Sequence, residues 1–503
     1  MAQDPILSAF DSLVRRAPSA PLLIAPRQAA TVAPGADIAA IADTAVATVA
    51  DIDGLARAAG AVLSVRPGGF APGEVVGLAA CNGPGLPAAL LALLRAGLPA
   101  LLLDAQAPEA ESLRIARSLG AATLLRCRSC WPTGEEDFAL SDTGLDEGAG
   151  PLCLPGIGVL KLTSGSTGAP RGIATPSAAL VADDAALAAA MGFRADDRLL
   201  AAIPMSHSYG LSSLVLPALM RGTPLVLPEE HGLLAPFAAA AAAGATVFPT
   251  VPAYVEALLG LSHPPAWPPS LRLVITAGAR LKPAAARRFR ETFGLPIHAF
   301  YGASESGGIC YDREGGAGER GTVGTPVSGV DVTLVPEGKE EGETGGGRVA
   351  VCSAAVAARY LPDADPRLTD GRFLTSDFAT WENGELALHG RLDDLINVKG
   401  KKVDPREVES VLAGLPGVDE VAVLGVLLPE RGSEVVRAVI ACRPGALSSE
   451  QVLRWCRGHL AAHKVPRSVV LVAEMPRTAR GKIDRPALLA LAGGASLDPV
   501  RVD

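Results

Sequence analysis

The sequence lacks the features that mark several common classes of protein. Its one Cys-x-x-Cys pair is Cys127 and Cys130, and no second pair or nearby histidine cluster completes a zinc site, so we expect the eight cysteines to be reduced thiols. The net charge of −8 argues against a general nucleic-acid-binding protein. Because charged residues make up only 19% and hydrophobic residues 49% of the chain, the composition is that of a folded globular protein.

The sequence also has no uninterrupted apolar segment of membrane-spanning length. The N-terminus carries an early acid and no continuous apolar core, so we expect no secretory signal peptide. Residues 232–255 contain no charged residue, but three prolines and a glycine interrupt them. We expect a helix over 236–243 followed by a buried strand over 245–248, and a cytoplasmic protein without a membrane span.

Helical and strand patterns alternate along the first 300 residues or so. Runs with helical spacing, such as 52–65 and 85–96, alternate with short apolar runs such as 75–80 and 99–103. This alternation predicts an α/β fold in which helices cover mostly parallel or mixed sheets. Shorter strands separated by turns follow, which predicts a small β subdomain over about 319–390.

The C-terminal part has a different pattern. A helix opening at Asp404 is followed by two strands, a second helix and a further strand, which predicts a compact α+β domain. We place a large N-terminal domain at residues 1–390 and a small, mobile C-terminal domain at residues 391–503. The C-terminal domain is mildly basic and the remainder is acidic, which suits a domain that closes over an anionic ligand.

A glycine- and hydroxyl-rich stretch, Leu162 to Ile173, is the strongest candidate for a phosphate-binding loop. Its glycines let backbone N–H groups approach an anion, its Ser and Thr residues supply hydroxyl donors, and Arg171 supplies charge. It is not a Walker loop, since G-x-x-x-x-G-K-[ST] occurs nowhere in the chain. We predict a strand before the loop and a helix starting at Thr175-Pro176 after it. Taken alone, a flexible surface loop explains the same composition.

Further stretches carry side chains suited to a nucleotide site. Glu305 follows a predicted strand and, beside phosphates, makes sense as a ligand of a bridging Mg²⁺. Tyr301 offers a flat face for a base, and Asp377, predicted at a turn, can accept both hydroxyls of a ribose. Residues 390–400 mix a cation, two acids and a glycine, and Lys482 lies near the end. Singly, the acids are more often caps or turn residues and Lys482 a solvated lysine, but their conjunction favours a site.

Together these motifs resemble the adenylate-forming superfamily of acyl- and aryl-CoA synthetases, nonribosomal adenylation domains and luciferases. Their order and spacing match from about Ile52 to Leu488. The resemblance implies that ATP activates a carboxylic acid to an acyl-adenylate with release of pyrophosphate, and that a thiol then accepts the acyl group. It implies ATP, Mg²⁺ and CoA as cofactors. The nucleotide-binding residues that it implies are Thr163, Ser164, Gly165, Ser166, Thr167, Gly168, Ala277, Gly278, Ala279, Tyr301, Gly302, Ala303, Ser304, Asp377, Arg391, Lys399 and Gly400.

The resemblance also assigns individual roles. It implies that Tyr301 stacks on adenine, that Asp377 and Arg391 bind the ribose, and that Asp393 is a hinge about which the small domain rotates. Lys399-Gly400 resembles the segment that lines the thiol channel. The implied catalytic residues are Lys482, which bridges the carboxylate and the α-phosphate, Arg171, His207, which closes the acyl pocket, and Glu305, which holds Mg²⁺. The implied pocket consists of His207, Tyr209, Ser213, Val251, Ala277, Gly302 and Gly307.

Three positions depart from the family pattern. Arg171 stands where the family usually has lysine and keeps the charge and the hydrogen-bond donors. Ser304 replaces the usual threonine, and Ser376 replaces the usual glycine before Asp377. We expect the phosphate contacts to survive with altered geometry.

The acid and the acceptor are less sharply defined. No carboxylate lies in residues 207–211 to pair with the ammonium of an amino acid, so we expect a fatty or aromatic acid. The acceptor is CoA or, alternatively, the phosphopantetheine arm of a carrier protein. A non-catalytic acyl- or nucleotide-binding homologue is a further alternative. A serine hydrolase is a weaker one, because GASES at 302–306 lacks the final glycine of a nucleophile elbow.

Overall fold

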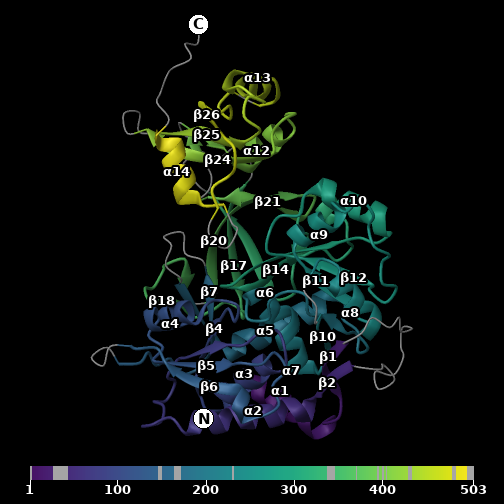
Figure 1. Cartoon of the computed structure of the whole chain (residues 1–503), viewed down its shortest axis with the longest axis vertical. Helices are drawn as coiled ribbons and strands as arrows, with labels where there is room; N and C mark the ends of the chain where they lie inside the picture. The colour runs from purple at the N-terminus through teal and green to yellow at the C-terminus, as the bar shows by residue number, and fades with distance from the viewer. Residues whose placement is uncertain are drawn as a thin grey trace. The chain divides into compact units, whose positions relative to one another are not determined.

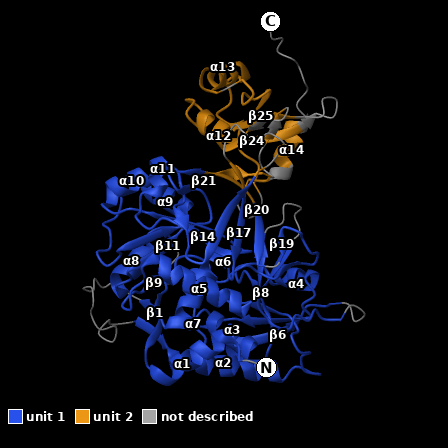
Figure 2. Cartoon of the chain, turned by 180° about the vertical axis from the view of Figure 1, so that it is seen from behind, with its two compact units in different colours: residues 1–335, 349–375, 381–387 blue, residues 336–348, 376–380, 388–503 orange. Residues whose placement is uncertain are grey.

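The computed structural model (Figure 1) describes residues 3–26, 44–145, 150–163, 171–228, 232–336, 346–369, 371–392, 396–398, 401–403, 405–428, 433–460, 462–477 and 483–494. The chain forms two compact units (Figure 2). The first comprises residues 1–335, 349–375 and 381–387, and the second comprises residues 336–348, 376–380 and 388–503. The division of the functional domains after residue 390 stays a prediction.

A nine-stranded sheet in the first unit has the order β15-β14-β13-β12-β11-β9-β10-β1-β2. Its inner strands, from β13 to β1, run parallel, and β2, β14 and β15 at its edges are antiparallel. The strands are β1 (Pro21–Pro26), β2 (Thr44–Thr48), β9 (Leu199–Leu200), β10 (Leu225–Val226), β11 (Val247–Thr250), β12 (Leu273–Thr276), β13 (His298–Ala303), β14 (Gly307–Tyr311) and β15 (Thr325–Pro326).

A seven-stranded sheet in the same unit has the order β18-β8-β7-β4-β3-β5-β6. Its centre, β7-β4-β3-β5, is parallel, and its edges are antiparallel. The strands are β3 (Val76–Ala79), β4 (Ala100–Leu103), β5 (Thr123–Cys127), β6 (Phe138–Asp142), β7 (Ile157–Thr163), β8 (Arg171–Pro176) and β18 (Arg359–Leu361). The two large sheets confirm the α/β fold with parallel and mixed sheets.

The helices of the first unit follow sequence signals. α10 begins with a proline in its first turn and ends at Gly294, which has the left-handed conformation that favours glycine. Among the described residues, no helix is long and apolar enough to cross a membrane. The helices are α1 (Pro5–Arg16), α2 (Val49–Ser64), α3 (Gly85–Arg95), α4 (Glu109–Ser118), α5 (Ser177–Met191), α6 (Ser208–Gly210), a π-helix (Leu211–Val215), α7 (Leu216–Arg221), α8 (Ala235–Ala243), α9 (Pro252–Leu259), α10 (Pro283–Phe293) and α11 (Ala317–Arg320).

The shorter strands predicted between residues 319 and 390 are confirmed as a five-stranded sheet. It consists of β16 (Val330–Val335), β17 (Gly347–Ser353), β19 (Leu368–Thr369), β20 (Arg372–Glu382) and β21 (Glu385–Arg391). The C-terminal part is α+β, as predicted, with its own apolar core around Val408, Leu412 and Ile440. Its elements are β22 (Ile396–Val398), β23 (Lys401–Val403), α12 (Pro405–Ala413), β24 (Glu420–Leu428), β25 (Ser433–Ala441), α13 (Ser449–His459), β26 (Ser468–Val472) and α14 (Arg485–Gly494).

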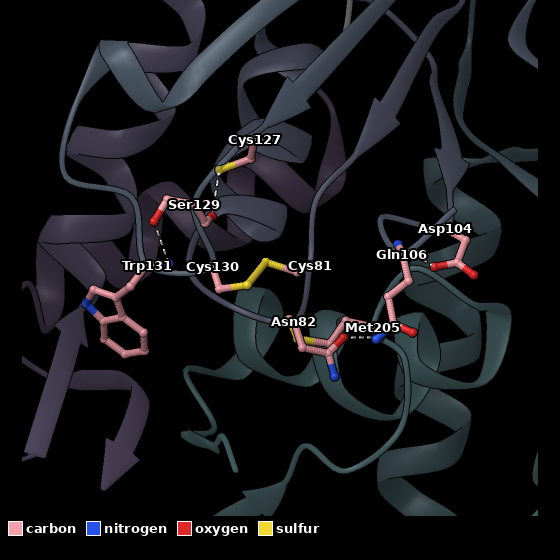
Figure 3. Close-up of a disulfide and its surroundings, with 9 residues drawn as sticks. All are labelled: Cys81, Asn82, Asp104, Gln106, Cys127, Ser129, Cys130, Trp131 and Met205. Atoms are coloured by element: carbon pink, nitrogen blue, oxygen red, sulfur yellow. Dashed lines mark hydrogen bonds between the residues drawn. A yellow bond between two sulfur atoms is a disulfide. The ribbon is translucent and has the colours of Figure 1, made fainter. Parts of the chain in front are cut away.

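The expectation that all cysteines are reduced is wrong. Cys81, just after β3, forms a disulfide with Cys130, just after β5, and the two Cα atoms are 5.5 Å apart (Figure 3). The Cys127 side chain of the Cys-x-x-Cys pair stays a free, buried thiol. Spacing along the chain misled the prediction, because the two bonded cysteines are 49 residues apart and only the pairing of β3 with β5 brings them together.

Asp197 fastens the N-terminal ends of neighbouring parallel strands. Its carboxylate accepts hydrogen bonds from Thr246 Oγ1 at 2.7 Å, just before β11, and from Arg272 Nε at 3.0 Å, just before β12. The Arg194 N–H donates to it at 2.7 Å. Burial acts to raise the pKa of Asp197, but these hydrogen bonds and the charge of Arg272 outweigh burial and hold the pKa below its usual value.

Replacing this carboxylate is expected to destabilise the first unit. Asp197→Asn should lower the free energy of unfolding near neutral pH by about 3 kcal/mol, because Arg272 loses a buried counter-charge. Since the folded pKa is depressed, the carboxylate stabilises above its unfolded pKa of about 4, and this contribution is lost as the pH falls through the folded value. Urea unfolding near pH 7 and at about pH 3 should show the difference narrowing in acid. The exposed neighbour supplies the control: an equal loss in Asp196→Asn would contradict this role.

Candidate active site

The residues predicted for the acid pocket lie largely at the carboxyl ends of strands in the nine-stranded sheet. β11, β12 and β13 are parallel neighbours. Val251 directly follows β11 and Ala277 directly follows β12, and Gly302 is the last residue but one of β13. A Cβ atom on Gly278 would lie 4.0 Å from Val251. The structure therefore brings these residues together at the carboxyl ends of the strands, where open α/β sheets bind ligands.

The segment after β9 adds the helical side of this site. His207 is exposed at the start of α6, and the Tyr209 hydroxyl donates to the Ile275 carbonyl of β12 at 3.2 Å. Burial raises the pKa of Tyr209, so the phenol stays protonated. Ser213 lies in the π-helix, and its buried hydroxyl has no hydrogen-bond partner among the described residues. Widened helical turns of this kind are frequent at functional positions.

The turn between β13 and β14 carries Ser304 and Glu305 and is fixed from below by Asp183 on α5. The Asp183 carboxylate accepts from the Gly308 N–H at 2.9 Å and from Ser212 Oγ at 2.6 Å. Gly307 has φ +69°, and a Cβ atom there would lie 2.3 Å from Asp183 Oδ1, so glycine is required. Ser208 Oγ also donates to Ser304 Oγ at 2.7 Å. These contacts fix the position of the turn relative to the helical segment 208–215.

Arg171 and Glu305 belong to one connected set of side chains. The Tyr360 hydroxyl donates to Glu305 Oε1 at 2.8 Å, and the Arg171 guanidinium lies 4.0 Å from the centre of the Tyr360 ring. Arg171 Nη1 also donates to Asp365 Oδ2 at 3.1 Å. Hydrogen bonds from Arg367 and Arg171 hold the pKa of Asp365 well below its usual value, so this carboxylate stays charged. Tyr360 therefore joins the predicted phosphate cation to the predicted metal ligand.

The predicted surroundings of the glycine loop need a correction. Thr163 ends β7 and Arg171 begins β8, and the two residues pair directly in an antiparallel ladder. The loop therefore joins two strands rather than a strand and a helix, and Thr175-Pro176 lies in β8, with α5 starting at Ser177. Pairing of β8 with β7 on one side and β18 on the other explains why these residues extend as a strand.

The predicted ribose ligands lie on neighbouring strands. Asp377 is in β20 and Arg391 ends β21, and these strands pair. The Leu392 N–H donates to the Ser376 carbonyl at 2.6 Å, which brings the two segments together. The prediction that Asp377 sits at a turn is wrong, because pairing with β21 extends its backbone. Of the other predicted residues, Tyr301 and Ala303 lie in β13, where the Tyr301 side chain is buried, and Ala279 follows β12. Nine predicted residues lie outside the described residues: Ser164, Gly165, Ser166, Thr167, Gly168, Asp393, Lys399, Gly400 and Lys482.

Glu305 suits a Mg²⁺ ion that is shared with a substrate. Within the described ranges, no group of three or more His, Cys, Asp or Glu residues could hold a metal ion. Mg²⁺ is commonly bound by one or two carboxylates together with substrate phosphates and water, so a single hard oxygen ligand is compatible with it. Glu305 is half-buried, and Tyr360 hydrogen-bonds one of its oxygens, so its carboxylate is oriented before any ligand binds.

Lys161 and Asp183 were not anticipated as part of this site. Lys161 on β7 is 4% exposed. Burial lowers its pKa, while the charges of Asp183 and Glu305 act to raise it. Burial likewise raises the pKa of Asp183, opposed by the hydrogen bonds of Ser212 and Gly308 and by the charge of Lys161. A lysine inside an apolar strand and an Asp-Asp pair inside an apolar helix were the sequence signals; Tyr360 and Asp365 had none of comparable strength.

The buried charges of Lys161 and Asp183 should depend on each other. Asp183→Asn is expected to lower the free energy of unfolding by about 3 kcal/mol, because it removes one of the two counter-charges that act on the buried Lys161 side chain. Adding Lys161→Met removes that charge and should recover part of the loss. Chemical unfolding of both single variants and the double variant measures this coupling. A double variant no more stable than Asp183→Asn would show that the two charges do not stabilise each other.

Comparisons with known proteins identify the family of this chain. The family model described as "AMP-binding enzyme" matches residues 157–361, and "AMP-binding enzyme C-terminal domain" matches residues 407–482. A feruloyl-CoA synthase from Amycolatopsis sp is 32% identical over 386 residues, which cover 74% of this chain and 76% of that protein. Oxalate–CoA ligase from Arabidopsis thaliana is 30% identical over 394 residues, or 76% of each chain.

Solved structures show the same fold. ATP-bound MatB from Rhodopseudomonas palustris superposes with a TM-score of 0.77 at 23% identity and covers 97% of this chain and 99% of its own. The o-succinylbenzoate CoA synthetase MenE from Bacillus subtilis, in complex with the acyl-adenylate OSB-AMP, gives a TM-score of 0.76 at 21% identity and covers 97% of this chain and 98% of its own. With the matched family models and relatives, the chain belongs to the adenylate-forming AMP-binding enzymes, and it is an AMP-forming acid–thiol ligase that uses ATP to activate a carboxylic acid.

Proposed function

We propose that this enzyme converts a fatty or aromatic carboxylic acid to its CoA thioester through an enzyme-bound acyl-adenylate. The observation that carries the proposal is that the 208–215 segment and the turn with Glu305 have a fixed position relative to each other. Asp183 bonds to both, at Ser212 and at Gly308. An acid beside Tyr209 and a nucleotide beside Glu305 would thus be held in a constant relative position, which is what a reaction between two bound anions requires.

The lining of the pocket supports an acid without an amino group. Residues 207–211 contain no carboxylate to pair with an ammonium. Val251, Ala277 and Gly302 at the strand ends are small or apolar, and Tyr209 supplies an aromatic ring. The buried Ser213 hydroxyl has no hydrogen-bond partner among the described residues, so it is available to an oxygen substituent of the acid. A feruloyl-CoA synthase among the relatives supports an aromatic acid within this class.

Adenylation requires charge neutralisation as well as positioning. A carboxylate attacks the α-phosphorus of ATP, so two anions must meet in one site. We assign Arg171 to the phosphates and Lys482 to the bridge between the carboxylate and the α-phosphate. Glu305 would hold Mg²⁺, which when bound supplies further positive charge beside the phosphates. Tyr360 stacks on Arg171 and bonds to Glu305, so it orients both groups at once.

Thiol transfer needs a different set of residues at the same adenylate. In this proposal Asp377 and Arg391 hold the ribose, and rotation about Asp393 withdraws Lys482 and brings Lys399-Gly400 to the adenylate. Closure of the C-terminal domain excludes water from the acyl-adenylate, which hydrolyses easily. The phosphopantetheine arm of a carrier protein is the alternative acceptor, since it presents the same thiol. The reaction is expected in the cytoplasm.

Acid-dependent pyrophosphate release is the first test of this function. With ATP and Mg²⁺, a panel of fatty and aromatic acids should give release with at least one acid, and the rate should rise when CoA is added. Amino acids serve as the matched negative panel, because the pocket offers their ammonium no carboxylate. A rate of pyrophosphate release that CoA does not change would favour a carrier-protein acceptor. Activity with amino acids alone, or no release with any acid, would overturn the proposal.

Replacing Lys482 tests the division of labour between the half-reactions. Lys482→Ala should slow adenylation by roughly 10²–10³-fold, the effect of removing one well-placed donor to developing charge. Transfer from a separately prepared acyl-adenylate to CoA should change little. Lys464→Ala, which removes a lysine paired with Glu407 in the same unit, is the control and should leave both rates unaffected. Equal losses in both half-reactions of Lys482→Ala would rule out domain alternation.

A further inference from the structure

We propose that Asn82 is a positioning residue for the acid-binding segment, and that the Cys81–Cys130 disulfide fixes Asn82, so that reduction by a dithiol weakens acid binding. The inference rests on the proposed function, because it takes residues 204–210, which carry His207 and Tyr209, as part of the acid pocket. Nothing in the assigned chemistry uses Asn82 or either of these cysteines.

The Asn82 side chain clamps the chain just before His207. Its Nδ2 donates to the Ile203 carbonyl at 2.8 Å and to the Ala201 carbonyl at 3.4 Å. Its Oδ1 accepts from the Met205 N–H at 2.8 Å, a bond that Figure 3 shows. Ile203 and Met205 are buried, so these main-chain groups have little access to water. One amide therefore satisfies both a donor and acceptors of a segment that ends two residues before His207.

The hydrogen bonds of Asn82 join the two large sheets at the carboxyl ends of their parallel strands. Asn82 follows β3 of the seven-stranded sheet, and residues 201–205 follow β9 of the nine-stranded sheet. Both strands are parallel to their inner neighbours, so both segments lie at carboxyl ends. A small shift of Asn82 would therefore move the helical side of the acid pocket relative to the strand ends that form its other side.

The loop that carries Asn82 is held against the loop after β5. A Cβ atom on Gly83 would lie 2.0 Å from the Cys130 carbonyl oxygen, and one on Gly85 would lie 2.4 Å from Cys127 Sγ. The Cys81–Cys130 bond adds a covalent link at the same contact. Asn82 is thus bracketed by a disulfide on one side and a close backbone contact on the other, which fixes where its amide can point.

The bond is accessible to a reductant. Cys130 is exposed and Cys81 is half-buried. A thiolate of the dithiol attacks Cys130 Sγ, the S–S bond breaks, and Cys81 leaves as a thiolate that takes a proton. The second thiol of the reagent then resolves the mixed disulfide, so that two electrons and two protons reach the protein and the reagent becomes a disulfide.

The neighbouring thiol does not compete in this exchange. Burial raises the pKa of Cys127 to about 11, and its Sγ donates to the Ser129 carbonyl at 3.2 Å. Only thiolates attack disulfides, so Cys127 is a poor nucleophile near neutral pH. In the cytoplasm, where we expect this enzyme, disulfides are generally transient and redox-sensing rather than structural. An accessible disulfide beside a substrate-positioning residue matches that use.

Steady-state adenylation measured by hydroxylamine trapping tests the proposal. Asn82→Ala should raise the KM for the acid by roughly tenfold, because three main-chain groups lose their partner, with the KM for ATP unchanged. Asn82→Asp keeps the acceptor for the Met205 N–H but loses the donor to the carbonyls. Its KM for the acid should lie between the values of the unaltered enzyme and of Asn82→Ala. Pretreatment with dithiothreitol and the Cys130→Ser variant should each raise the acid KM by about threefold, with Cys153→Ser, which removes an exposed free cysteine, as control. An unchanged acid KM in Asn82→Ala would overturn the positioning role.

Hydrogen–deuterium exchange separates this inference from the proposed function. The Met205 amide should exchange faster in Asn82→Ala and, to a smaller degree, after reduction, whether or not an acid substrate has been found. Dithiothreitol should have no further effect on Cys130→Ser. Faster exchange in a protein that releases no pyrophosphate would leave the clamp standing and remove the proposed function. Unchanged exchange and an unchanged acid KM after reduction would overturn the redox part.

Discussion

The carboxylate of Asp183 is the contact on which the arrangement of the site depends. It lies at a point where α5, the π-helix and the turn after β13 meet, and it bonds to Ser212 and Gly308. The turn requires glycine at position 307 because a side chain there would collide with this carboxylate. A buried carboxylate is costly unless it is paired. The cost is tolerable here because two donors and the charge of Lys161 act on it.

The same constraint explains the charge pattern of the surrounding residues. Lys161 lies on β7, and its charge interacts with both Asp183 and Glu305. On the other side of Glu305, Tyr360 connects it to Arg171, which Asp365 holds. Each of these acids thus has a hydrogen-bond donor that holds it in place, so little reorganisation is needed when an anionic substrate arrives.

Local patterns predicted the elements but not the pairings between them. α10 and the strand ends that carry Val251 and Ala277 were predictable, because proline, glycine and apolar periodicity mark them. The antiparallel partnership of β7 with β8 and the extended backbone at Asp377 depend on hydrogen bonds to distant strands, which no local signal records. The disulfide follows the same rule, since strand order sets the distance between Cys81 and Cys130.

The position of the site between two sheets makes its geometry depend on what joins them. Strand ends within one sheet are fixed by continuous hydrogen bonding, but the two large sheets share no ladder among the described strands. The 201–205 segment follows β9 of one sheet, and the loop after β3 follows a strand of the other, so in the proposed site a side chain that bonds across them would set the distance between the two sides of the acid pocket. Asn82 is such a side chain. An enzyme that must hold an acid opposite a nucleotide can therefore be tuned at this junction without altering any group that touches either substrate.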